Sequence, residues 1–154
     1  MGCLWDKLNG TKYPVGDVAP ISAAQVRATL LALNGADVTY RVRKALPAEK
    51  ADLVAECHIR RVGVRLKTRM RLIPEKQEVR FLHERWENRP FDSANEQYGR
   101  GHAPTVYREW QFEPGPDGKQ HKVEAFRFDT REMTDSLQRT VLEAGWTWRG
   151  VFKL

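Results

Sequence analysis

The sequence predicts an α+β fold, a single curled antiparallel sheet of about six to seven strands packed against two helices. Three observations support this. Several segments alternate apolar and polar residues with a period of two, and short turns join them. Two segments carry apolar residues at helical spacing, one near the N-terminus and one before the last strand. A chain of 154 residues is long enough to bury one core.

We expect residues 1–20, which Gly and Pro interrupt, to be an irregular N-terminal arm and residues 21–154 to form the single α+β domain. Within the arm, one short apolar turn is expected to dock on the body, formed by Cys3, Leu4, Trp5 and Leu8.

Both helices have recognisable ends. The first begins at Ser22, whose spacing to Gln25 matches a capping box, and ends at Asn34-Gly35. Asp129 is expected to cap the second, and Gly145 to end it. The inward residues of the second helix are Met133, Leu137, Val141 and Ala144.

Strand patterns cover residues 38–42, 53–59, 64–72, 78–87, 105–112, 123–128 and 146–154. Residues 114–118 predict a hairpin turn, and residues 88–104 a loop of about 17 residues, a length that is usually functional or mobile. Three tryptophans are expected in the core or at its margin, namely Trp110, Trp146 and Trp148.

The strand over residues 64–72 carries the clearest functional signal. Its inward set is apolar except for Thr68, and its outward set is an unbroken basic row, Arg65, Lys67, Arg69 and Arg71. The net charge of +6 is concentrated here, because residues 57–74 hold six basic residues and no acid.

The neighbouring strand, 78–87, has apolar side chains on both faces, so that aromatic or aliphatic groups share the basic face in either register. If the connection at Pro74 has an even number of residues, the row faces Arg80, Leu82, Glu84 and Trp86. If the number is odd, the row faces Val79, Phe81, His83 and Arg85. Cations neutralise phosphates and aromatic rings stack on bases, which favours an anionic partner such as single-stranded nucleic acid. The candidate binding residues are Arg65, Lys67, Arg69, Arg71, Arg80, Trp86 and Arg100.

Three alternatives stay open. The basic face is also compatible with a solvated surface on which acids pair with some of the cations. The large aromatics are compatible with a pocket for a small hydrophobic or amphiphilic ligand between the sheet and the second helix. An exposed face or edge is compatible with a protein-interaction scaffold or a homo-oligomer.

Other classes receive little support. No catalytic motif, cofactor fingerprint or zinc spacing occurs, so no catalytic residue, cofactor or metal is predicted. Glu84 and His83, adjacent on one strand, are expected on opposite faces. The two cysteines and the lack of an apolar span or signal pattern indicate a cytoplasmic protein with no membrane partner, and Cys57 is expected to be a buried hydrophobe.

The Arg-rich composition, seventeen Arg to nine Lys, and the segment Ala-Gly-Trp-Thr-Trp-Arg-Gly at residues 144–150 resemble small uncharacterised proteins of high-GC actinobacteria. This resemblance implies no activity.

Overall fold

The computed structural model describes residues 4–89, 92–100 and 105–154. Within them, three α-helices, α1 (Leu4–Asn9), α2 (Ala23–Leu31) and α3 (Arg131–Glu143), accompany eight strands. The strands are β1 (Arg41–Lys44), β2 (Leu53–Ile59), β3 (Val64–Ile73), β4 (Glu78–Arg89), β5 (Asp92–Arg100), β6 (Val106–Pro114), β7 (Gln120–Asp129) and β8 (Thr147–Gly150). The predicted α+β fold, with helices near the N-terminus and before the last strand, is confirmed.

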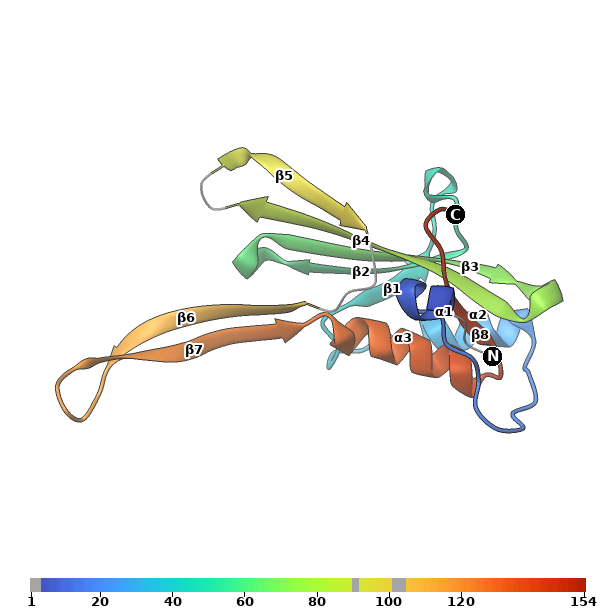
Figure 1. Cartoon of the computed structure of the whole chain (residues 1–154), viewed down its shortest axis with the longest axis horizontal. Coiled ribbons are helices and arrows are strands. Elements are labelled where there is room, and N and C mark those ends of the chain that lie inside the picture. Colours follow the sequence, from blue (N-terminus) through green and yellow to red (C-terminus); the bar gives the residue numbers. More distant parts are fainter. Residues whose placement is uncertain (1–3, 90–91, 101–104) are drawn as a thin grey trace.

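The main sheet has six strands in the order β1-β2-β3-β4-β5, and β8 also pairs with β4 (Figure 1). All pairs among β1 to β5 are antiparallel, as short turns favour. β8 lies parallel to β4, because α3 carries the chain back along the sheet before this strand begins. One edge of β4 is therefore shared by β8 along its first residues and by β5 along its last.

Alternation along the strands separates two faces of this sheet. The inner face packs against α2 and α3 and forms the core, and the outer face is turned away from it. Trp146 and Trp148 are buried in the core as predicted, and the Trp148 ring stacks on Phe81 with centroids 4.1 Å apart. Cys57 is buried there too, and burial raises the pKa of its thiol to about 11.

The ends of the helices agree in part with their predicted ends. Both bonds of the capping box between Ser22 and Gln25 are present, but α2 ends at Leu31, before Asn34-Gly35. The N-cap of α3 is Thr130, not Asp129, whose carboxylate instead accepts a hydrogen bond from the backbone of Arg131. The predicted inner face of α3 is buried.

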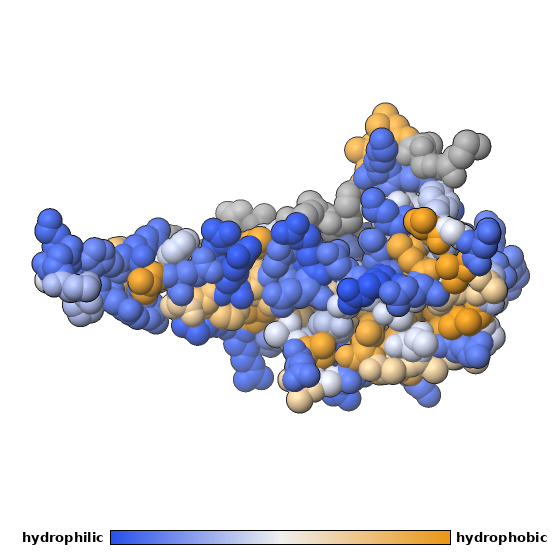
Figure 2. Space-filling model, turned by 90° about the horizontal axis from the view of Figure 1, so that it is seen from below, coloured by the Kyte–Doolittle hydropathy of each residue, from blue (hydrophilic) through white to orange (hydrophobic). Residues whose placement is uncertain are grey.

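β6 and β7 form a two-stranded ribbon apart from the main sheet, which corrects the expectation of one sheet. The predicted turn at 114–118 closes this hairpin, with Gly118 at φ 77°. The ribbon extends away from the body (Figure 1), and the face of it seen in Figure 2 is largely hydrophilic. We call it the arm. Trp110, predicted in the core or at its margin, is 44% exposed on the arm.

The prediction of a long loop at residues 88–104 is wrong for most of these residues. β4 continues to Arg89 and β5 occupies residues 92–100, so the polar residues of this stretch belong to a strand pair. Residues 90–91 and 101–104 lie outside the described residues.

Both ends of the chain differ from expectation. The apolar turn predicted within residues 1–20 is the helix α1, but it docks with its polar side: Asp6 and Asn9 are buried, whereas Leu4 is 75% exposed. Cys3 lies outside the described residues. The last strand ends at Gly150, and Phe152 is exposed and meets the Trp5 ring edge-on.

In the described part of the chain, no helix is both long enough and apolar enough to cross a lipid bilayer.

Candidate functional site

The basic row lies on the outer face, as the alternation predicts. Arg65 and Arg71 are exposed, and Lys67 and Arg69 are half-buried between them. The register is the even one: the row stands opposite Trp86, Glu84, Leu82 and Arg80 of β4. A basic strand and a strand of mixed polarity therefore share one surface.

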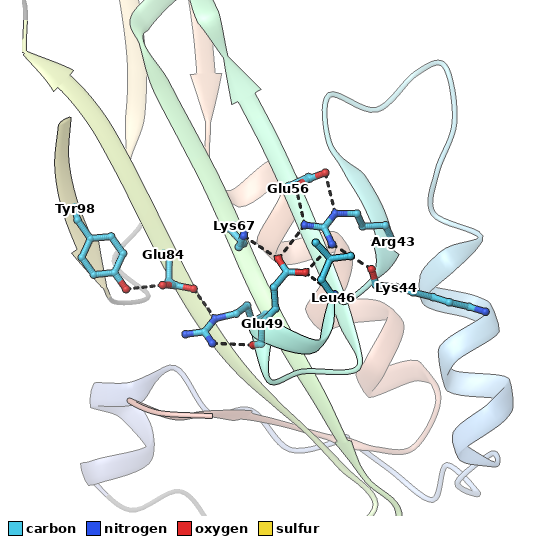
Figure 3. A network of polar contacts seen from close by, with 9 residues as sticks. Arg43, Lys44, Leu46, Glu49, Glu56, Lys67, Glu84 and Tyr98 are labelled. Carbon is cyan, nitrogen blue, oxygen red and sulfur yellow. Dashed lines mark hydrogen bonds and ion pairs between the residues drawn. The ribbon is translucent and has the colours of Figure 1, made fainter. Parts of the chain in front are cut away.

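Glu49 lies over the middle of this row (Figure 3). It comes from the turn between β1 and β2, and its carboxylate accepts hydrogen bonds from Arg43 Nη1 at 2.8 Å and Lys67 Nζ at 2.8 Å. Arg69 Nη1 donates to the backbone oxygen of Glu49 at 2.9 Å. The bonds from Arg43 and Lys67 outweigh burial and hold the pKa of Glu49 well below its usual range. The turn thus covers part of the face, and Val54 beneath it is fully buried.

Glu84, on β4, is the second carboxylate that contacts the basic row. It is buried, and Arg69 Nε donates to it at 2.6 Å while the Tyr98 hydroxyl donates to its other oxygen (Figure 3). Partial burial and this bond to Glu84 raise the pKa of Tyr98. Lys67 and Arg69, the two central cations, are therefore held by acids of the same chain.

One end of the outer face gathers rings and cations, and we call it the aromatic end: Arg65, Lys67, Trp86, Tyr98 and Arg100. The Arg65 guanidinium lies 5.2 Å from the centre of the Trp86 ring, and Lys67 Nζ lies 5.9 Å from it. The Tyr98 ring centre is 5.2 Å from that of Trp86. Arg100 bonds the Tyr98 hydroxyl and lies 5.5 Å from its ring centre. Cation–π contacts hold each ring beside a positive charge.

The opposite end of the face is ordered by Glu78. Arg71 and Arg80 stand side by side there, and Arg80 Nε and Arg149 Nε donate to Glu78 at 2.8 Å and 2.7 Å. Burial would raise the pKa of Glu78, but the bonds from Arg149 and Arg80 outweigh it and lower that pKa.

The inner face carries a separate feature. Beside the first turn of α3 the described residues line a cavity of ≈ 60 Å³. Its polar wall includes Thr68 and His83, which face each other across β3 and β4 and are joined by a hydrogen bond of 2.7 Å. Glu84 and His83 do lie on opposite faces, as expected.

The structure thus places all seven predicted binding residues on the outer face, but it does not bring them together at one point. Arg65, Lys67, Trp86 and Arg100 meet at the aromatic end, Arg69 lies at the centre, and Arg71 and Arg80 lie at the far end. Two members of the site, Tyr98 and Glu49, were not among the predicted binding residues. Tyr98 fell within the predicted loop, because residues 92–100 lack strand alternation, and its pairing with Trp86 follows only from the formation of β5. Glu49 carried no periodic signal.

Among the described residues, no group of three or more His, Cys, Asp or Glu side chains is arranged to hold a metal ion. The outer face offers guanidinium and ammonium donors beside aromatic rings, which suits the binding of a planar anionic ligand.

No protein-family model, no curated protein and no solved structure matches this chain.

Proposed function

We propose that this chain is a non-enzymatic binding domain that takes up an anionic ligand, single-stranded nucleic acid, on the outer face at the aromatic end. The observation that carries the proposal is the Trp86 ring, held beside Tyr98 and within about 6 Å of the charges of Arg65 and Lys67. A base can stack on such a platform while its phosphates meet the neighbouring cations.

The charge of the whole outer face supports the same partner. Among the residues whose side chains the structure describes, the outward positions of its strands, together with Glu49 above them, carry more bases than acids. The bases are Arg41, Arg43, Arg65, Lys67, Arg69, Arg71, Arg80, Arg100 and Arg149, and the acids are Glu49, Glu56, Glu78 and Glu84. An excess of cations remains after internal pairing, and such an excess attracts polyanions.

Internal pairing gives the face its shape. Because Glu49 and Glu84 fix Lys67 and Arg69, these long side chains lose little further freedom when a ligand arrives. Arg65 and Arg71 are exposed at the two ends of the row, where phosphates can reach them. A strand of nucleic acid running along β3 would meet both.

The test is a titration of the protein into fluorescently labelled oligothymidylate at low salt, with the fluorescence anisotropy of the label as the readout. Substituting Trp86→Leu removes the stacking ring and is expected to weaken binding by roughly 5- to 100-fold, as loss of one stacked base does. Arg65→Gln is expected to reduce the slope of log affinity against log salt by about 1.

The matched control is Arg139→Gln, which makes the same charge change at an exposed position of α3, on the other side of the sheet. It is expected to bind as the unmodified chain does. Undetectable binding at low salt would refute the nucleic-acid proposal. Equal losses in Arg65→Gln and Arg139→Gln would show that only net charge matters and that the site is misplaced.

A further inference from the structure

A second site, independent of the outer face, is indicated by the cavity on the inner face. It lies between β3, β4 and β5 and the first turn of α3, and its volume is ≈ 60 Å³. That is room for about four water molecules. It is far below the several hundred Å³ typical of pockets for drug-sized ligands. A small occupant therefore fits it better than a long hydrophobic one.

The polar wall of this cavity interrupts an otherwise apolar layer. Thr68 is fully buried, although its inward neighbours on β3 are all apolar. Its hydroxyl lies 2.7 Å from Nδ1 of His83. Two more hydroxyl side chains, Thr130 and Thr134, line the cavity from α3. Each of these hydroxyls has one partner within the chain, and a hydroxyl can both donate and accept, so this convergent set beside a hollow can also bind a polar ligand.

One guanidinium of the inner face, that of Arg85, can meet an anion in the cavity, and it is shared with Glu87. Arg85 lines it, and its Nη1 donates to Thr105 at 2.5 Å while its Nε lies 3.2 Å from Glu87. Arg100 lines it from β5 too, but its guanidinium lies on the outer face, where it bonds the Tyr98 hydroxyl. The one acid in the lining is Glu84, and its carboxylate is turned to the outer face, where Arg69 binds it.

The remaining wall is apolar, formed by Leu66 and Met133. A cavity with hydroxyls and a guanidinium on one side and aliphatic carbons on the other matches a short-chain carboxylate. Its carboxylate would meet the polar wall, and its two or three carbons the apolar wall.

The geometry points to this cavity as a binding site for a small organic carboxylate. Gly99 is the residue that keeps it open. Gly99 pairs with Arg85 on the inner face and lines the cavity, and a Cβ built on it would meet no atom within 4 Å. Its φ is not positive, so a side chain at this position causes no backbone strain.

The experiment titrates propionate into the full chain and follows the backbone amide and side-chain methyl NMR signals of Thr68 and Met133. Sodium chloride at equal ionic strength and inorganic phosphate are titrated in parallel. Saturable shifts of both signals with propionate, and not with chloride or phosphate, are the expected result. No saturable shift, or saturation by phosphate alone, would overturn the assignment of a carboxylate.

Two variants tie binding to the cavity. Gly99→Val fills the space and is expected to abolish the shifts, while Gly35→Val, at another glycine whose Cβ would meet no atom within 4 Å, leaves them unchanged. Thr68→Val keeps the shape of the side chain but removes its hydroxyl, and it is expected to weaken binding about tenfold. Melting curves establish that each variant is folded. Full propionate binding by a folded Gly99→Val variant would show that the cavity is not the site.

Discussion

At the scale of single residues, two carboxylates decide how much positive charge the outer face presents. Glu49 holds Arg43 and Lys67, and Glu84 holds Arg69. The basic row itself follows from alternation and is predictable from the sequence. The position of Glu49 is not, because it depends on how the turn between β1 and β2 folds back over the sheet, and no periodic pattern records that.

Glu49→Gln tests the carboxylate at the centre of the row. Loss of its charge leaves the half-buried Arg43 with Glu56 alone and takes from Lys67 the carboxylate that it binds, so the free energy of unfolding at pH 7 is expected to fall by about 1–2 kcal/mol. Urea unfolding measures this. Glu75→Gln, at an exposed position, is the control and is expected to change stability little.

The same carboxylate makes the unfolding free energy depend on pH. The pKa of Glu49 is lower in the folded chain than the ordinary value of 4.5, so its ion pairs stabilise the fold above that value. This stabilisation is lost as the pH falls below about 4.5 toward the folded-state pKa. The unfolding free energy of Glu49→Gln is therefore expected to fall less between pH 5 and about pH 3 than that of the unmodified chain. Parallel profiles for the two proteins would contradict this.

At the scale of elements, sequence patterns located most strands and both long helices, and they failed where tertiary contacts decide. Residues 92–100 are polar and contain Gly99, so they lack strand alternation and form β5 only because β4 offers its edge. The apolar side chains of α1 face outward because Asp6 and Asn9 are used for docking: Asp6 accepts a hydrogen bond from the Tyr13 hydroxyl at 2.7 Å and lies 3.9 Å from Arg149 Nη1 of β8.

The docking of α1 depends on Gly150, because the end of the helix passes against this residue of β8. A Cβ on Gly150 would lie 1.7 Å from the backbone oxygen of Asn9. Gly150→Ala is therefore expected to displace α1 and to lower the unfolding free energy by about 2 kcal/mol or more. Urea unfolding and limited proteolysis near α1 measure the effect. Gly35→Ala is the control, and equal stability of the two variants would show that α1 does not depend on this contact.

The arm is expected to be the least stable part of the described chain. A two-stranded ribbon with Trp110 and Phe112 exposed lacks the packing that stabilises the main sheet. Hydrogen exchange followed by mass spectrometry should therefore show faster exchange in the distal halves of β6 and β7 than in β3. Protection of the arm equal to that of β3 would mean that something covers it in solution, such as a second copy of the chain.

At the scale of the whole molecule, one sheet separates two kinds of chemistry. Its outer face is a network of cations, acids and rings, and its inner face is an apolar core with one polar hollow beside α3. Composition and alternation predict this division. They do not predict the parallel placement of β8, because the return path through α3 is set by packing and not by local pattern.

The measurement that tests the central claim most directly is the NMR spectrum of the indole N–H groups of the five tryptophans during titration with oligothymidylate. The signal of Trp86 is expected to move and saturate, because the ligand stacks on that ring. The signals of Trp146 and Trp148, both buried in the core, should stay in place. A saturated complex in which the Trp86 signal has not moved would contradict binding at the aromatic end.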